Sequence, residues 1–383
     1  MTLYPGYVEP KFLPRAQLQQ LIDTLIDAGH HVYGPQQRDD AIIYAPLKTT
    51  TELPLGIEDH HAPGSYRLTN NGSQHWFDWV STPQGIKPLL FKPRETLWRA
   101  TRDATGTIHF KDPDSNVEKI AVIGVRSCDL AALKLQDQHF LSVEHTPDPF
   151  YAERRRNLFL VAINCTRAAD TCFCVSSGDG PKCNAPNRAQ IFDIAMTELD
   201  SGFVITTGST PGQHIIDQLT LNSADEAQLN EAAQREANAT LQQRAVPSQN
   251  MRDTLFGALD HPQWDEIASR CLSCGNCTAV CPSCFCYSEK SEPQLDGSSS
   301  EQRREWDSCF TQGHSYMHGT TVRHDTKLRY RQWLTHKFAG WHDQYGRSGC
   351  SGCGRCITWC PPGIDIIAEL TILNSDKGDA GDA

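Results

Sequence analysis

Two cysteine runs near the C-terminal end hold the residues best suited to metal chemistry. They read Cys271-Leu-Ser-Cys274-Gly-Asn-Cys277-Thr-Ala-Val-Cys281-Pro282 and Cys350-Ser-Gly-Cys353-Gly-Arg-Cys356-Ile-Thr-Trp-Cys360-Pro361. Both have the spacing C-x2-C-x2-C-x3-C-P. The two-residue spacers let three thiolates converge on one centre, and Gly275 and Gly354 let the backbone approach it without a Cβ in the way. The chemistry that this spacing indicates is iron–sulfur ligation.

The duplicated run predicts two [4Fe–4S] clusters with exchanged fourth ligands. In bacterial ferredoxins, three cysteines of such a run bind one cluster and the fourth binds the other. We therefore expect one cluster on Cys271, Cys274, Cys277 and Cys360, and a second on Cys350, Cys353, Cys356 and Cys281. Pro282 and Pro361 suit the first turn of a helix. Zinc knuckles are the alternative, but they usually use separated C-x2-C pairs or mixtures of Cys and His.

Length and composition restrict the class of protein. The 383 residues are enough for two or three domains, and no run of eighteen apolar residues predicts a membrane span. The N-terminus lacks the basic and apolar segments of a secretory signal, so sixteen cysteines indicate metal ligands in a cytoplasmic protein rather than disulfides. A net charge of −11 argues against nucleic acid as a partner.

The N-terminal half predicts an α/β (or α+β) domain. The pattern at 14–28 indicates an amphipathic helix ended by Gly29, and 50–93 reads as hairpins and loops. Apolar runs at 119–126 and 158–163 flank a helix that starts near residue 129, which is typical of a parallel βαβ unit. Ligands gather at the carboxyl ends of such strands. No flavin, nicotinamide or P-loop motif is recognisable in the chain.

Five more cysteines follow these predicted strands within 56 residues, at positions 128 to 183. Cys128 and Cys165 each lie just past a strand end, and Cys172 and Cys174 follow closely. A lone buried cysteine is usually a small hydrophobic residue, but five together favour a metal site. We predict a third [4Fe–4S] cluster on Cys128, Cys165, Cys172 and Cys174, with zinc at the same sulfurs as the alternative.

The predicted domain organisation has four parts. Residues 1–222 form the N-terminal domain with the third site, and 223–265 form a helical linker that opens with a capping box, Ser223-Ala-Asp-Glu226. Residues 266–372 form a two-cluster domain like that of bacterial ferredoxins, with a long insertion, 282–349, between the runs. The Gly/Asp/Ala-rich residues 373–383 are expected to be a disordered tail.

The predicted insertion contains further thiols and histidines. Cys284, Cys286 and Cys309 are expected to pack beside the clusters, because the two runs already supply eight ligands. His314 and His318 are one helical turn apart, but without a nearby carboxylate an ordinary core or surface role is favoured. Six basic residues would form a solvated face that could also lie near the anionic clusters and raise their potentials. They are Arg303, Arg304, Arg323, Arg329, Arg331 and Lys337.

These motifs together resemble a known family. The segments concerned are Gly124-Val-Arg-Ser-Cys128-Asp-Leu, Asn164-Cys165, Thr171-Cys-Phe-Cys174, Arg270-Cys-Leu-Ser-Cys-Gly-Asn-Cys277, Cys281-Pro-Ser-Cys-Phe-Cys286, Trp306-Asp-Ser-Cys309-Phe and the second cysteine run. The combination resembles the beta subunit of cytoplasmic bidirectional nickel–iron hydrogenases, or sulfhydrogenases. The electron-passing component of anaerobic sulfite reductase shares most of the pattern. The segments 91–95 and 363–365 are closer to the hydrogenase branch, whereas Cys183 is more typical of the sulfite-reductase branch.

The resemblance implies an electron-transfer subunit without substrate chemistry or catalytic residues of its own. Its partners would be a flavin-containing, NAD(P)H-binding diaphorase subunit together with the small and large subunits of a nickel–iron hydrogenase. The alternative is a component that passes electrons to the siroheme subunit of a sulfite reductase. Two other classes are a self-contained enzyme with an open cluster site in the N-terminal domain, and a purely structural iron–sulfur scaffold.

Overall fold

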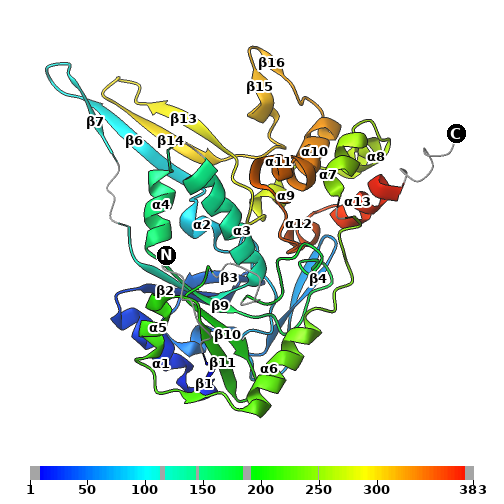
Figure 1. The fold of residues 1–383 in the computed structure, drawn as a ribbon. Helices are drawn as coiled ribbons and strands as arrows, with labels where there is room; N and C mark the ends of the chain where they lie inside the picture. The colour runs from blue at the N-terminus through cyan, green and yellow to red at the C-terminus, as the bar shows by residue number, and fades with distance from the viewer. Residues whose placement is uncertain (1–8, 113–116, 144–145, 184–190, 249, 376–383) are drawn as a thin grey trace.

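A mixed sheet occupies the N-terminal half of the computed structural model, which describes residues 9–112, 117–143, 146–183, 191–248 and 250–375. Within these residues the sheet has eight strands in the order β12-β1-β11-β10-β9-β8-β2-β3 (Figure 1). They are β1 (Lys11–Pro14), β2 (His31–Arg38), β3 (Ala41–Pro46), β8 (Ile120–Val125), β9 (Leu158–Ile163), β10 (Ile194–Glu198), β11 (Gly202–Thr207) and β12 (Asn222–Ser223). The central strands β2, β8, β9 and β10 are parallel, and the outer pairs are antiparallel.

Helices cover both faces of this sheet. α1 (Leu18–Asp27) and α5 (Thr210–Ile216) pack on one face, and α3 (Ser127–Asp137) and α4 (Pro149–Arg156) on the other. Each face of the sheet has its own hydrophobic core, because successive strand residues point to opposite faces. Ile123 belongs to the core that contains α1, and Val122 to the core that contains α3. The predicted βαβ unit is confirmed, since β8 and β9 are parallel neighbours. The first helix ends as predicted before Gly29, whose φ is 85°.

A second sheet projects from the body as an arm and joins distant parts of the chain. Its order is β13-β14-β6-β7, from β6 (Arg94–Arg102), β7 (Ile108–Lys111), β13 (Tyr287–Pro293) and β14 (Ser299–Trp306). Strands from the N-terminal half therefore pair with strands from between the two cysteine runs (Figure 1). At its base, buried Glu95 accepts a hydrogen bond from Arg304 at 2.6 Å and pairs with Arg154.

The segment 50–93 contains one hairpin and several buried loop residues. The hairpin is β4 (Ile57–Ala62) and β5 (Ser65–Asn70), and the Gly64 amide at its turn donates to the Ile357 carbonyl at 3.1 Å. Phe77 and Trp79 are not in a strand, yet both are buried in the core of the large sheet. The short helix α2 (Lys87–Leu90) follows. This segment thus connects the sheet to the second cysteine run.

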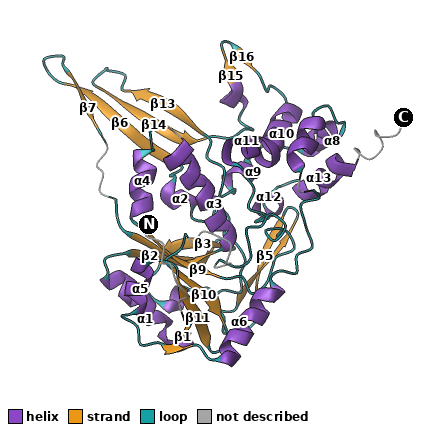
Figure 2. Cartoon of the chain, viewed as in Figure 1, coloured by secondary structure: helices purple, strands orange, loops and turns teal. Residues whose placement is uncertain are grey.

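The C-terminal half has its own core of helices. These are α7 (Met251–Gly257), α8 (Gln263–Arg270), α10 (Thr326–Thr335), α11 (Trp341–Tyr345) and α13 (Ile366–Ser375). Buried Trp264, Leu334 and Leu370 belong to one hydrophobic cluster between them. Figure 2 shows these helices grouped on the side of the molecule away from β7, with the small hairpin β15 (Tyr316–Met317) and β16 (Thr320–Thr321) above them. In the described part of the chain, no helix is long and apolar enough to cross a membrane.

The segment expected to be a linker divides between the two cores. α6 (Glu226–Asn238) packs on β10 and β11 through Ala232, whereas α7 belongs to the C-terminal core. The predicted capping box is wrong by two residues: the cap is Asp225, because Ser223 is held in β12 opposite Lys11. Residues 373–375, expected in the tail, instead complete α13, where Leu373 is buried; 376–383 lie outside the described residues.

Candidate metal centres

The first cysteine run surrounds one pocket at the end of α8. Cys271 terminates α8, and Gly275, with a φ of 74°, starts the short helix α9 (Asn276–Ala279). The pocket is lined by the thiols predicted for the first cluster, Cys271, Cys274, Cys277 and Cys360, and also by Cys356. Phe310, Tyr330 and Trp333 form its apolar wall. The structure therefore brings together the four residues that the spacing assigned to one cluster.

The second run repeats this arrangement deeper in the molecule. Gly354, with a φ of 73°, starts the helix α12 (Arg355–Thr358) as Gly275 starts α9. Burial and then the neighbouring charges of Cys350, Cys353 and Cys281 raise the pKa of the Cys356 thiol. Burial likewise raises the pKa of Cys350 to about 12. The four thiols predicted for the second cluster are therefore electrostatic neighbours.

Backbone amides point at the sulfurs in both runs. The amides of Ser273 and Gly352 donate to Cys271 Sγ and Cys350 Sγ, each at 3.4 Å, so the same turn recurs in the two runs. The Ile364 amide donates to Cys360 Sγ at 3.4 Å. Such donors stabilise anionic sulfur and are one of the means by which proteins set cluster potentials.

The expectation that a proline starts a helix after each run is wrong. Pro282 and Pro361 lie in turns that follow the short helices α9 and α12. The fourth cysteine of each run precedes its proline and already lies outside the helix. Proline has no N–H and clashes with a preceding helical turn, so here it stops a helix rather than starting one.

The thiols predicted for the third site line one pocket beside the sheet. Cys128 lies in the first turn of α3, Cys165 follows β9, and Cys172 and Cys174 come from the next loop. Burial raises the pKa of all four thiols, to about 12 for Cys174. A fifth thiol, Cys353 of the second run, lines the same pocket. Residue spacing contained no sign of this fifth member.

Cys183 lies apart from that pocket. Its thiol contacts the Ile163 carbonyl oxygen at 3.6 Å, and its amide donates to Asn164 Oδ1 at 2.7 Å. It is not among the residues that line the third-site pocket. Cys183 therefore fits a packing role better than a ligand role.

The third-site loop and the second run make direct backbone contact. The Phe173 amide donates to the Gly352 carbonyl at 2.9 Å. A Cβ on Gly352 would lie 2.5 Å from Cys174 Cα, and one on Gly354 would lie 2.3 Å from the Thr171 carbonyl oxygen. Only glycine permits this approach, which packs Cys128, Cys174 and Cys353 into one buried cluster.

Three buried cations lie beside the thiols. Lys337 Nζ is 3.4 Å from Cys281 Sγ. Lys87 donates to the Ala279 carbonyl at 3.1 Å, and burial lowers its pKa to about 8. Arg355 pairs with Asp129 at 2.8 Å, next to Cys128. Sequence reasoning missed Lys87 and Arg355; for Arg355 the available signal was its place inside the second run, one residue before Cys356.

The other predicted basic residues have different partners. Arg304 pairs with Glu95 and Asp148 at the base of the arm, and Arg303 pairs with Glu292 and Glu301 along it. Arg329 of α10 donates to the carbonyls of Arg323 and His324 in the loop before that helix, and Arg331 donates to the Leu259 carbonyl. Lys337 is thus the residue placed against a thiol of the cysteine runs, whereas Arg303, Arg304, Arg329 and Arg331 bind carboxylates or carbonyls of the chain. Arg323 is an electrostatic neighbour of Cys309, which lies between the runs.

The remaining thiols between the runs separate into two groups. Cys284 makes a hydrogen bond with Cys281, which lowers the pKa of the Cys281 thiol. Cys286 and Cys309 instead lie with His314, all three ligand atoms being within 4.8 Å of one another. His314 and His318 do not share a helix face, because His314 lies in a 3-10 turn and His318 lies at the tip of the β15–β16 hairpin. The metal pair that their spacing allowed in principle, and that was disfavoured, is therefore not formed.

The donor set fits iron–sulfur clusters. Burial raises the pKa of these thiols because the thiolate form lacks a counter-charge there, and bound iron would supply that charge. In each run, a backbone amide of the turn points at a cysteine sulfur, and none of the sixteen cysteines forms a disulfide.

Comparisons with known proteins agree with this geometry. Residues 270–364 match the family described as 4Fe-4S dicluster domain, and residues 227–285 match a second family of the same description. Sulfhydrogenase 2 subunit beta of Pyrococcus furiosus is 29% identical over 321 residues, which cover 81% of this chain and 89% of that protein. The chain is thus similar over most of its length to a hydrogenase beta subunit. The name of this relative and the dicluster matches together indicate that the chain is an iron–sulfur electron-transfer subunit, with a mixed α/β fold and C-terminal 4Fe–4S dicluster domains.

No solved structure matches this chain. The dicluster match covers both cysteine runs but does not include the N-terminal sheet, so it bears on the first two sites alone. The third-site pocket and its link to Cys353 come from the structure.

Proposed function

We propose that this subunit relays electrons between a flavin subunit that binds NAD(P)H and a nickel–iron hydrogenase module in the cytoplasm. The observation that carries the proposal is the position of the second cysteine run between two other groups of thiols. Cys353 lines the pocket of Cys128, Cys165, Cys172 and Cys174, while Cys356 lines the pocket of the first run. One run thus adjoins both neighbouring sites, as a continuous relay requires.

The twelve predicted ligands would hold three [4Fe–4S] clusters, which supply one-electron transfer when bound. The third cluster, on Cys128, Cys165, Cys172 and Cys174, is supported by their common pocket. We keep the crossed assignment of Cys281 and Cys360, because Cys360 lines the first run's pocket and Cys281 is a charged neighbour of Cys356. Zinc at the third site is the alternative that metal analysis decides.

The chain's own residues would insulate and tune the relay. Phe310, Tyr330 and Trp333 cover one side of the first pocket with apolar surface, whereas Cys274 is exposed. Lys337, beside Cys281, would favour the electron-richer state of the second site, because a positive charge stabilises added negative charge. No substrate chemistry is assigned to this chain, and its partners would supply the nicotinamide and hydrogen reactions.

We assign three regions to this relay: 1–222, 223–265 and 266–375, the last extended by the three residues that complete α13. Residues 282–349 would be an insertion that separates the halves of the dicluster domain. Its strands β13 and β14 form one sheet with β6 of the N-terminal region, which supports a role in holding the second run against the third site. The partners proposed are the diaphorase subunit together with the small and large hydrogenase subunits.

Reconstitution tests the proposal. The purified chain alone is expected neither to oxidise NAD(P)H nor to consume hydrogen or sulfite. Adding it to a flavin subunit plus a nickel–iron hydrogenase dimer should restore NAD(P)-linked hydrogen turnover, whereas each partner should keep its activity with an artificial dye when this chain is omitted. Coupled turnover without this chain, or restoration only with a siroheme sulfite reductase, would contradict the hydrogenase assignment.

A further inference from the structure

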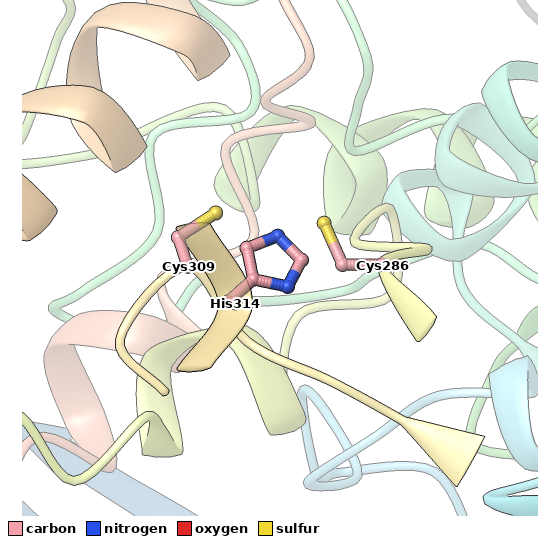
Figure 3. A group of neighbouring side chains, drawn as sticks. All are labelled: Cys286, Cys309 and His314. Atoms are coloured by element: carbon pink, nitrogen blue, oxygen red, sulfur yellow. The ribbon is translucent and has the colours of Figure 1, made fainter. Parts of the chain in front are cut away.

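A group of three metal-binding side chains lies outside the twelve cysteines assigned to clusters. Cys286 precedes β13, Cys309 follows β14, and His314 lies in the turn Gln312–Ser315. Each offers one ligand atom, and these atoms all lie within 4.8 Å of one another. Figure 3 shows the His314 ring between the two cysteines, with both sulfurs on the same side as one ring nitrogen. Three segments thus converge on one point.

The histidine is already oriented for a metal. His314 Nδ1 is 2.8 Å from Asp307 Oδ2, so Nε2 is the nitrogen left for a metal ion. Metal-binding histidines commonly donate the other ring N–H to a carboxylate, which fixes the tautomer and makes the free nitrogen more basic. Asp307 therefore supplies the carboxylate that the sequence did not place near His314.

The spacing suits a single ion. Zinc binds thiolate sulfur at about 2.3 Å and imidazole nitrogen at about 2.0–2.1 Å, so tetrahedral geometry separates neighbouring ligand atoms by roughly 3.5–3.8 Å. Atoms within 4.8 Å of one another reach that geometry with small side-chain rotations. Ligands of a [4Fe–4S] cluster bind different corners of a cube and are spread more widely. The group is thus too tight for a cluster.

The group is distinct from the pockets of the first and third sites. None of its members lines the pocket of the first run or that of the third site, and Lys337 is a charged neighbour both of the group and of Cys281 of the second site. The neighbouring Cys284 is hydrogen-bonded to Cys281 rather than to Cys286. Among the described residues, the group contains no fourth His, Cys, Asp or Glu.

We propose that Cys286, Cys309 and His314 bind one zinc ion, with the fourth position taken by a non-protein ligand. Two thiolates and an imidazole are the donors that zinc prefers, and they disfavour magnesium or calcium. The ion would fasten the base of the β13–β14 hairpin, where the Asp307 amide also donates to the Cys286 carbonyl at 2.9 Å. It thereby ties the arm to the loop that carries His314.

Metal counting on the purified full chain tests this site. Elemental analysis should give about one zinc per chain besides the iron of the clusters. Cys286→Ser and Cys309→Ser should each remove that zinc and leave the iron content and cluster spectra unchanged. Cys183→Ser is the matched control, because it removes a buried thiol outside every site and should retain the zinc.

Two further measurements keep the test decisive if a cysteine variant folds poorly. Asp307→Asn keeps all three ligands and should weaken zinc retention against a chelator by about 10- to 100-fold. Zinc-edge X-ray absorption, which the iron does not mask, should show sulfur at about 2.3 Å and nitrogen at about 2.0–2.1 Å. Absence of zinc from the wild-type chain, iron at this site, or loss of about four irons in Cys286→Ser would overturn the proposal. Loss of iron only when a cluster cysteine is replaced, with zinc retained, would support the separate zinc site.

Discussion

At the scale of single residues, Lys337 is the clearest electrostatic device. It is 4% exposed, and its Nζ lies 3.4 Å from Cys281 Sγ and 3.1 Å from Ser283 Oγ. Burial alone would lower its pKa, but the charges of Cys281, Cys284 and Cys350 raise it well above the ordinary value. The side chain is therefore a permanent positive charge beside the second run.

Removing this charge should lower the reduction potential of the second cluster. We expect Lys337→Met to shift it by on the order of 100 mV to more negative values, from Coulomb's law over about 6 Å at an effective dielectric constant of about 20. Redox titration followed by electron paramagnetic resonance measures the shift. Lys327→Met is the control, because Lys327 pairs with exposed Asp265. Equal shifts in both variants would refute a local effect of Lys337.

Cys281 decides whether fourth ligands are exchanged. Cys281→Ser should perturb the cluster whose other ligands are Cys350, Cys353 and Cys356, because the fourth thiolate of one run reaches the other cluster. Resonance spectra of the reduced protein should show the cluster of the first run nearly unchanged. A change confined to the first run's own cluster would exclude exchange.

At the scale of elements, the two glycine turns of the second run hold the sites together. Gly352 and Gly354 have φ values of 66° and 73°, and each brings the backbone against the loop at 171–174. This loop in turn carries Cys172 and Cys174. The distance between the second and third sites therefore depends on backbone contact rather than on side chains.

Gly352→Ala should separate these elements. Its Cβ would lie 2.5 Å from Cys174 Cα, so one backbone must move, and we expect lower iron content and a lower midpoint of thermal unfolding. Gly297→Ala is the matched control, because Gly297 has a φ of 68° but nothing within 4 Å. Gly297→Ala should lower the free energy of unfolding by only about 1–2 kcal/mol, which is the cost of a left-handed backbone for a residue with a Cβ. Equal losses of iron and of thermal stability in the two variants would mean that the left-handed backbone alone matters, and not the contact of Gly352 with Cys174.

At the scale of the whole molecule, the second run connects the N-terminal sheet to the C-terminal helices. Arg355 of that run is buried and pairs with Asp129 of α3, and it also donates to the Thr82 carbonyl. The hairpin amide of Gly64 reaches the same run at the Ile357 carbonyl. The two halves thus share a polar interface at the point where the proposed relay crosses it.

Loss of the third site should interrupt the relay without unfolding the dicluster part. Cys165→Ala and Cys172→Ala should each reduce iron by about four per chain and leave the other two clusters in place. In the reconstituted complex, NAD(P)-linked hydrogen turnover should fall while dye-linked activities persist. Cys183→Ala should change neither iron nor turnover. Unchanged iron in both ligand variants would make these thiols packing residues.

The sequence by itself determined the features that depend on short-range spacing. Three thiols separated by two residues must converge, so the two runs and their common chemistry could be read directly. The same holds for the strands at 120–125 and 158–163, whose apolar runs are local. Local patterns were less reliable at the ends of elements. Ser223 pairs with Lys11 in β12, so the cap of α6 is Asp225 instead of Ser223.

Only the tertiary structure decided which separate segments meet. Cys353 joins the third-site pocket because glycine turns let two backbones touch, and Asp307 reaches His314 because β14 ends beside that turn. Lys87 lies about two hundred residues from the carbonyls that hold it, at Thr278 and Ala279. Such contacts follow from how sheets and helices pack, which residue spacing along the chain does not encode.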